Sequence, residues 1–103
     1  MKIFFTGRFN PRMAIRRVGY GELINPRSGQ LSYTRRLGSG QFPRFHIYIE
    51  EKNGGMELHL HLDQKQPTYG DFTAHSGEYD GEVVEREAGR IQAAIGGPST
   101  LLA

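Results

Sequence analysis

The stretch RFHIYIEEKNGGMELHLHLD, residues 44–63, decides the fold. Apolar and polar residues alternate along both of its halves, and Asn53-Gly54 lies between them. An Asn-Gly pair between two alternating runs is the strongest short-range signal for a β-hairpin. A two-residue loop predicts three apolar cross-strand pairs, which are Ile49 with Leu58, Ile47 with Leu60, and Phe45 with Leu62. A turn at Gly54-Gly55 would shift the partners but keep the same residues on the same face, because side chains alternate with a period of two.

The second face of this hairpin is polar and holds three of the four histidines of the chain. The pairing predicts Arg44, His46, Tyr48 and Glu50 on one strand of this face, opposite Asp63, His61, His59 and Glu57 on the other. The apolar face needs a covering element, so we expect the histidine face to point away from it.

Length and composition place the chain among small single domains. Its 103 residues include 37% hydrophobic residues and no cysteine, which excludes disulfides and thiolate zinc sites. The longest apolar run near the start is Ile3-Phe4-Phe5, and Arg8 follows soon after, so we expect neither a signal peptide nor a membrane span. We therefore expect a soluble cytoplasmic protein with one domain over residues 1–98 and a tail over residues 99–103.

The segments before the central hairpin predict more strands. Residues 2–6, KIFFT, are apolar and aromatic and predict a strand, whereas residues 7–12 contain Asn-Pro and predict a loop. Residues 16–24 and 30–37 predict two further strands, joined by the turn sequence NPRSG at residues 25–29. These two strands would form a first hairpin.

Residues 80–95 predict the one helix of the chain. Asp80 is a favourable N-cap, and Gly96-Gly97-Pro98 ends the segment. An apolar stripe recurs at helical spacing and consists of Val84, Ala88, Ile91 and Ile95. Gly89 inside the helix lowers its stability by ~1 kcal/mol relative to alanine, so we expect the helix to lie close to the sheet at this position.

Together these elements predict an α+β fold. The expected architecture is a curled antiparallel sheet of two hairpins plus an N-terminal strand, five strands in all. One C-terminal helix would pack on the apolar face of the sheet, because the helix stripe and the apolar face of the hairpin can each be buried only against a partner.

The histidine face predicts a metal site. His59 and His61 point the same way along one strand, ~6.5–7 Å apart, and His46 lies on the paired strand. Three imidazoles in such a triangle can close on one ion at ~2.0–2.1 Å per nitrogen, leaving a fourth position open. His75 or Glu78, in the long polar segment 64–79, could complete or cap the site.

The expected ion is a divalent transition metal, with zinc the first choice, and an open position would permit metal-assisted catalysis. The alternative is that the histidine rings pack across the strands. Glu50, Glu57 and Asp63 would then hold them by hydrogen bonds without a metal.

Charge is distributed unevenly along the chain. Residues 1–48 carry nine Lys or Arg and one acid, a net charge of +8, whereas residues 49–103 carry four Lys or Arg and ten acids, a net charge of −6. Arginines with interleaved aromatic residues predict binding of RNA or single-stranded nucleic acid as a second function. The candidate residues are Arg16, Arg17, Tyr33, Arg35 and Arg36. A third hypothesis is a partner-binding or self-associating module, a homo-oligomer in which the oppositely charged halves meet.

Overall fold

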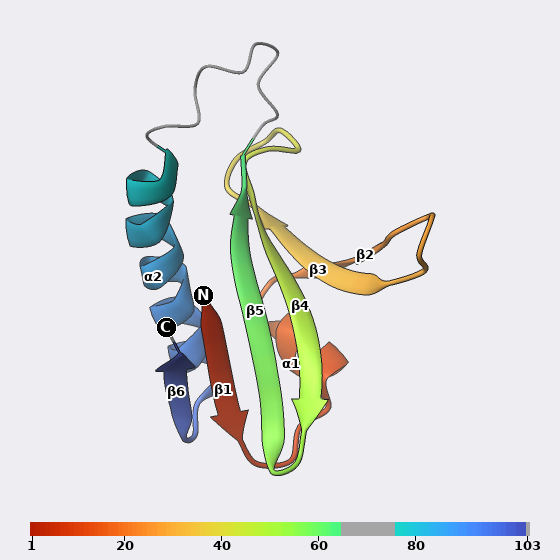
Figure 1. Cartoon of the computed structure of the whole chain (residues 1–103), viewed down its shortest axis with the longest axis vertical. Helices are drawn as coiled ribbons and strands as arrows, with labels where there is room; N and C mark the ends of the chain where they lie inside the picture. The colour runs from red at the N-terminus through yellow and green to blue at the C-terminus, as the bar shows by residue number, and fades with distance from the viewer. Residues whose placement is uncertain (65–75, 103) are drawn as a thin grey trace.

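The computed structural model describes residues 1–64 and 76–102, which form one six-stranded antiparallel sheet and two helices (Figure 1). The strand order is β2-β3-β4-β5-β1-β6, and the sheet does not close into a barrel. The elements in chain order are β1 Lys2–Thr6, α1 Pro11–Arg17, β2 Gly21–Ile24, β3 Leu31–Arg36, β4 Arg44–Lys52, β5 Gly55–Asp63, α2 Ser76–Ile95 and β6 Ser99–Leu102. The predicted α+β class, with a curled antiparallel sheet and a C-terminal helix, is confirmed.

The central hairpin has the predicted register. Strands β4 and β5 pair through a turn at Asn53-Gly54, in which Gly54 adopts a positive φ of +84°, a conformation open to glycine without steric cost. The three predicted apolar pairs are all present, namely Ile49 with Leu58, Ile47 with Leu60, and Phe45 with Leu62. This hairpin is the middle of the sheet and therefore fixes which face every neighbouring strand presents.

One core fills the apolar face of the sheet. Ile47, Leu58 and Leu60 are at most 1% exposed and belong to one buried cluster with residues of both helices. The helical members of the cluster are Ile15 and Val18 at α1 and Val84, Ala88 and Ile91 in α2. Helix α2 runs along the β5-β1-β6 side of the sheet (Figure 1). The histidine face consequently points away from both helices, as expected.

Helix α1 occupies the end of the predicted loop at residues 7–12 and the first two residues of the predicted strand at residues 16–24, whereas residues 7–10 are outside any helix or strand, as predicted. The Asn10 side chain accepts a hydrogen bond from the backbone N–H of Met13 at 3.2 Å, and Pro11 occupies the first turn. Asn-Pro therefore acts as an N-cap followed by a proline at N1, which starts a helix as readily as a turn. Gly19, at φ +104°, follows the end of the helix, and the strand β2 begins only at Gly21.

Helix α2 ends where the sequence predicts but begins earlier. It starts at Ser76 rather than after an N-cap at Asp80, so Asp80 lies inside the helix. At the other end Gly96 adopts φ +75° and its N–H donates to the carbonyl of Gln92 at 2.9 Å. Glycine takes this left-handed conformation without a steric penalty, which explains the sharp stop.

Residues 99–102, predicted to belong to a tail, form the edge strand β6. This strand pairs antiparallel with β1, so that Leu101 lies opposite Ile3. The backbone N–H of Thr6 donates to the Pro98 carbonyl at 3.1 Å, and the Gln92 side chain donates to Ser99 Oγ at 2.9 Å. The Gly96-Gly97-Pro98 reversal returns the chain to the sheet, where the open edge of β1 supplies the pairing partner.

Gly89→Ala is expected to stabilise the protein. The expectation that the helix approaches the sheet closely at Gly89 is wrong, because a Cβ there would meet no atom of the sheet within 4 Å. Alanine should therefore raise the free energy of unfolding by about 0.5–1 kcal/mol, measurable by urea denaturation. Gly55→Ala is the contrasting variant: its Cβ would overlap the Phe5 carbonyl oxygen, so it should destabilise. A Gly89→Ala protein no more stable than the parent would contradict this account of the helix.

Within the described ranges 1–64 and 76–102, no helix combines the length and the apolar character needed to cross a lipid bilayer.

Candidate functional site

The polar face of the β4–β5 hairpin brings the histidines next to one another as the register predicts. His46 lies opposite His61, and Tyr48 lies opposite His59. The rings of His46 and Tyr48 stack with centroids 4.7 Å apart, and His61 meets Tyr48 edge-on at 6.0 Å. The ring of Tyr48 therefore contacts one histidine from each strand.

His46 is held by hydrogen bonds on both ring nitrogens. Its Nδ1 lies 2.8 Å from Asp63 Oδ2, and its Nε2 lies 2.8 Å from Ser32 Oγ. The ring is 9% exposed and Ser32 is 3% exposed. The carboxylate, imidazole and hydroxyl are ordered as in a nucleophilic triad, but the burial of Ser32 closes its oxygen to a substrate. This chain of hydrogen bonds joins strands β3, β4 and β5, and His46 could ligate a metal only by giving up one of these bonds.

A second group on the same face has the spacing of metal ligands. Glu50, Glu57 and His59 each offer one ligand atom, and these atoms all lie within 4.8 Å of one another. His59 Nε2 lies 2.8 Å from Glu57 Oε1 and 3.6 Å from Glu50 Oε1. Among the described residues this is the one group of three or more His, Cys, Asp or Glu side chains with such spacing.

The metal-ligand group of Glu50, Glu57 and His59 contains two carboxylates of like charge. Glu50 and Glu57 face each other directly across the two strands, an arrangement that repels unless a cation lies between them. Lys52 Nζ lies 3.2 Å from Glu57 Oε2. Burial would raise the pKa of Glu57, but the hydrogen bonds and charges of His59 and Lys52 outweigh it and lower the pKa. Glu57, 5% exposed, is therefore an ionised and buried carboxylate.

The other predicted metal ligands lie elsewhere. His61 lies outside the group on the exposed surface. Partial desolvation of its ring, the positive charge of the chain N-terminus and the charge of His46 lower its pKa. His75 lies outside the described residues, as does the side chain of Glu78, which belongs to the first turn of α2. The predicted hydrogen-bonding alternative is present for two rings, His46 with Asp63 and His59 with Glu57.

The group of Glu50, Glu57 and His59 borders a pocket. A space of about 400 Å³ is lined by Gln30, Tyr48, Ile49, Glu50 and His59. A ligand at this position would reach Glu50 and His59 directly from solvent. The sequence contains the signal for this group, because the predicted register already places Glu50 opposite Glu57 and next to His59.

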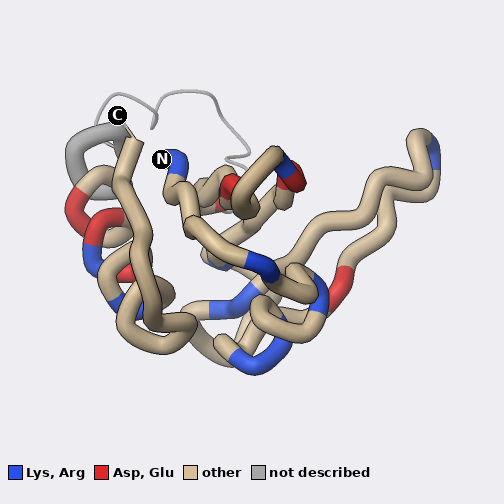
Figure 2. The backbone as a smooth tube through the Cα atoms, turned by 90° about the horizontal axis from the view of Figure 1, so that it is seen from below, with Lys and Arg blue, Asp and Glu red and all other residues tan. Residues whose placement is uncertain are grey.

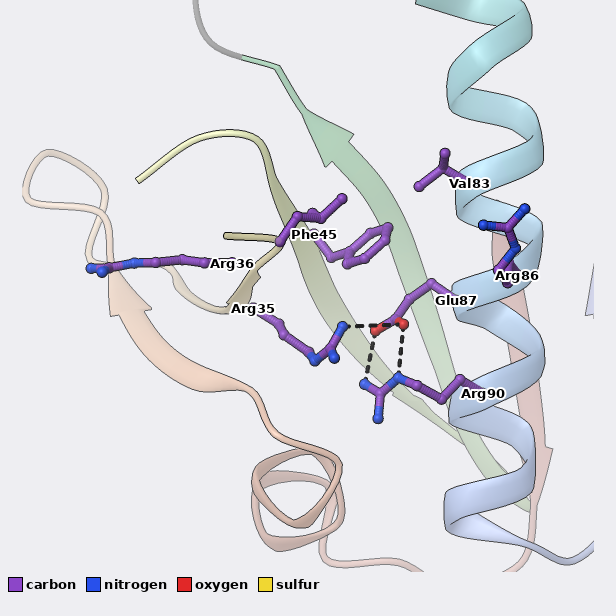
Figure 3. Close-up of a pocket in the computed structure, with 8 residues that line it drawn as sticks. Arg35, Arg36, Phe45, Val83, Arg86, Glu87 and Arg90 are labelled. Atoms are coloured by element: carbon purple, nitrogen blue, oxygen red, sulfur yellow. Dashed lines mark hydrogen bonds and ion pairs between the residues drawn. The ribbon is translucent and has the colours of Figure 1, made fainter. Parts of the chain in front are cut away.

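The opposite side of the molecule holds a second candidate site, which we call the arginine groove (Figure 3). It has a volume of about 420 Å³ and lies between β3, β4 and α2. Its lining residues are Arg35, Arg36, Leu37, Phe45, Val83, Arg86, Glu87 and Arg90. Arg86 and Arg90 come from the acidic half of the sequence, where no local pattern marks them as partners of Arg35.

Glu87 organises the floor of this groove. Its carboxylate, 4% exposed, accepts hydrogen bonds from Tyr20 at 2.6 Å and from Arg90 at 2.8 and 2.9 Å, with Arg35 at 3.5 Å (Figure 3). Arg90 Nη2 also donates to the carbonyl of Val18, at the end of α1, at 2.9 Å. The network ties α2 to α1 and to β3.

The predicted nucleic-acid residues are divided between elements. Arg16 and Arg17 lie in the last turn of α1 rather than on a strand, and Arg35 and Arg36 lie on β3. Tyr33 is 4% exposed and belongs to the core, so its ring is not available to stack on a base.

Comparison of the chain with protein-family models, with curated proteins and with solved structures found no match.

Proposed function

We propose that the protein binds one divalent transition metal ion, zinc first among them, through Glu50, Glu57 and His59. The observation that carries the proposal is the mutual distance of at most 4.8 Å between their ligand atoms. Atoms at such separations can close on a common ion with small rotations of the side chains. Both strands of the hairpin contribute, so the register of the central hairpin holds the ligands in place.

The donor set suits zinc. Zinc in proteins binds imidazole nitrogen and carboxylate oxygen at ~2.0–2.2 Å, with three protein ligands and an open position in its catalytic sites. Here the open position would face the pocket beside Tyr48 and Gln30. Water or a substrate could then complete the coordination. This deepens the predicted function of metal-assisted chemistry, without specifying a substrate.

Charge balance supports the same proposal. Two carboxylates opposed across a hairpin are stabilised by a divalent cation more fully than by Lys52, which pairs with Glu57 and with no other carboxylate of the described residues. The ion would take the place of the proton that His59 Nε2 shares with Glu57 Oε1. Because imidazole ligates only when neutral, zinc affinity is expected to fall as the solution becomes acidic.

The proposal differs from the predicted three-histidine site in its ligands. His59 is common to both, but His46 is engaged by Asp63 and Ser32, and His61 stands apart beside Tyr48. His75 and Glu78 remain predicted additional ligands.

A zinc titration of tag-free protein by isothermal calorimetry tests the proposal. The parent protein should bind one equivalent. The double variant Glu50→Gln, His59→Ala should bind at least about tenfold more weakly, because even the loss of a residue outside the first coordination shell has an effect of this size.

The matched control is Glu51→Gln with His61→Ala, which removes one acid and one histidine from the same two strands. It should bind like the parent. Equal losses in both double variants, or no zinc binding by the parent, would refute the proposed ligand set. Equal losses would instead favour the predicted three-histidine site, because that site contains both His59 and His61.

A further inference from the structure

We infer that the arginine groove and the last turn of α1 together bind single-stranded nucleic acid. This site is separate from the proposed metal site, since the two have no residue in common. The inference rests on the charge of the groove, on its continuity with α1 and on the apolar surface beside it.

The groove has an excess of positive charge. Four arginines and one described carboxylate, that of Glu87, are among the lining residues, which sum to a formal charge of +3. Arg36 lies at the edge of the groove, because alternation along β3 directs its side chain to the other face of the sheet from Arg35 (Figure 3). Arg35 and Arg90 share that carboxylate. Arg86 meets Glu82 at 3.6 Å, but both side chains are about three-quarters exposed, and surface pairs of this kind are weak. An incoming phosphate could replace Glu82 with little loss.

Arg36 is the least compensated member. It lies directly opposite Arg44 across the β3–β4 pair, and Arg44 is neutralised by Asp63 at 3.3 Å. No carboxylate of the described residues forms an ion pair with Arg36. Its side chain is directed away from Glu87 (Figure 3). An anion bound at Arg36 would supply the counter-charge that Asp63 supplies to Arg44.

The basic surface continues onto α1. The side chain of Arg35 lies over Gly19, where a Cβ would be 3.7 Å from its Cδ, and Arg90 binds the Val18 carbonyl. The turn of helix just before these contacts carries Arg16 and Arg17, both exposed, which with Met13 line a further pocket of about 370 Å³. Neither forms an ion pair within the described part of the chain. The backbone tube shows the Lys and Arg positions distributed over several elements (Figure 2).

The apolar surface beside these arginines favours a single strand over a free anion or a duplex. Leu37 lines the groove and is 44% exposed. The β3–β4 connection is closed by a hydrogen bond from the Leu37 N–H to the Pro43 carbonyl. Within this connection, Phe42 is 37% exposed, and its ring centroid lies 4.5 Å from the Arg44 guanidinium carbon. Arginines that track phosphates next to exposed aromatic rings that stack on bases are typical of single-strand binding. Paired bases in a duplex could not reach this surface.

Fluorescence anisotropy with a labelled oligo(U) of about 12 nucleotides, a length within the range of single-strand sites, tests the inference. Arg36→Ala and Arg86→Ala, alone and together, should weaken binding. Each variant should also reduce the slope of log K against log salt by about 0.7, the value for one phosphate contact with a single strand. Arg35 and Arg90 are left unchanged because they support Glu87.

Arg27→Ala is the charge-matched control, since it removes one arginine from the β2–β3 turn, far from α2 (Figure 1). It should change neither the affinity nor the salt slope by a comparable amount. Binding should also persist in a chelator, because the groove contains none of the proposed metal ligands. Failure of the zinc titration would thus leave this inference standing.

Three results would overturn the inference. The first is the absence of oligo(U) binding at low salt, and the second is an equal loss of affinity in Arg27→Ala and Arg36→Ala. The third is that polyglutamate, or a nucleic-acid duplex of the same length, displaces the labelled oligo(U) as effectively as unlabelled oligo(U) does. The last result would indicate an acidic protein partner or an unspecific polyanion site.

Discussion

Glu87→Ala is expected to lower the free energy of unfolding by about 3 kcal/mol, towards the lower end of the range for breaking a buried ion pair. The variant removes the acceptor of Tyr20 and of Arg90 and the nearest carboxylate to Arg35. Tyr20 is 3% exposed, so its hydroxyl loses its partner away from water. Arg35 and Arg90 are more than a third exposed and keep part of their hydration, which limits the loss.

The matched control is Glu82→Ala, on the same helix. Its carboxylate is 77% exposed and, among the described residues, meets Arg86 alone, at 3.6 Å, so its removal should change stability by no more than about 0.5 kcal/mol. Urea denaturation followed by circular dichroism measures both variants. Similar losses for Glu82→Ala and Glu87→Ala would mean that the buried network does not stabilise the fold.

The same carboxylate predicts a dependence of stability on pH. Burial would raise the pKa of Glu87, but hydrogen bonds from Arg90 and Tyr20 and the charges of Arg90 and Arg35 outweigh it, so the folded-state pKa lies below the ordinary value of 4.5. A lowered folded-state pKa means that the stabilisation is complete above pH 4.5 and is lost as the pH falls through the folded-state pKa. Glu87→Gln should therefore show a smaller loss of stability on acidification than the parent protein.

Leu60→Ala is the second substitution with a large expected effect, a loss of about 2–5 kcal/mol in the free energy of unfolding. Leu60 is 1% exposed and lies opposite Ile47 at the centre of the core. Truncation removes buried methyl groups and leaves a cavity between the sheet and the helices.

His61→Ala, at the next residue of β5, is the internal control for the face assignment. His61 is exposed, so its replacement should stay within about 0.5 kcal/mol of the parent. Thermal or urea unfolding of the two variants measures the difference. A loss for His61→Ala as large as that for Leu60→Ala would show that the polar face also faces a packed layer.

The sequence by itself determines the central hairpin, its register and its two faces. Asn53-Gly54 sets the turn, and the period of two then places Ile47, Leu58 and Leu60 together. The end of α2 is equally local, because Gly96 can take a conformation that other residues avoid. The register also predicts that Glu50 lies opposite Glu57, although it does not determine which ring nitrogen of His59 faces these carboxylates.

Only the tertiary structure decides the remaining elements and contacts. Asn10-Pro11 is compatible with both a turn and a helix start, and the burial of Ile15 against the sheet selects the helix. Strand β6 exists because β1, at the other end of the chain, offers an open edge. Ser32 reaches His46 only because β3 pairs with β4, and Glu87 reaches Tyr20 across 67 positions of sequence. Such contacts depend on how whole elements pack, so a local sequence pattern cannot predict a contact with a residue that is distant in the chain.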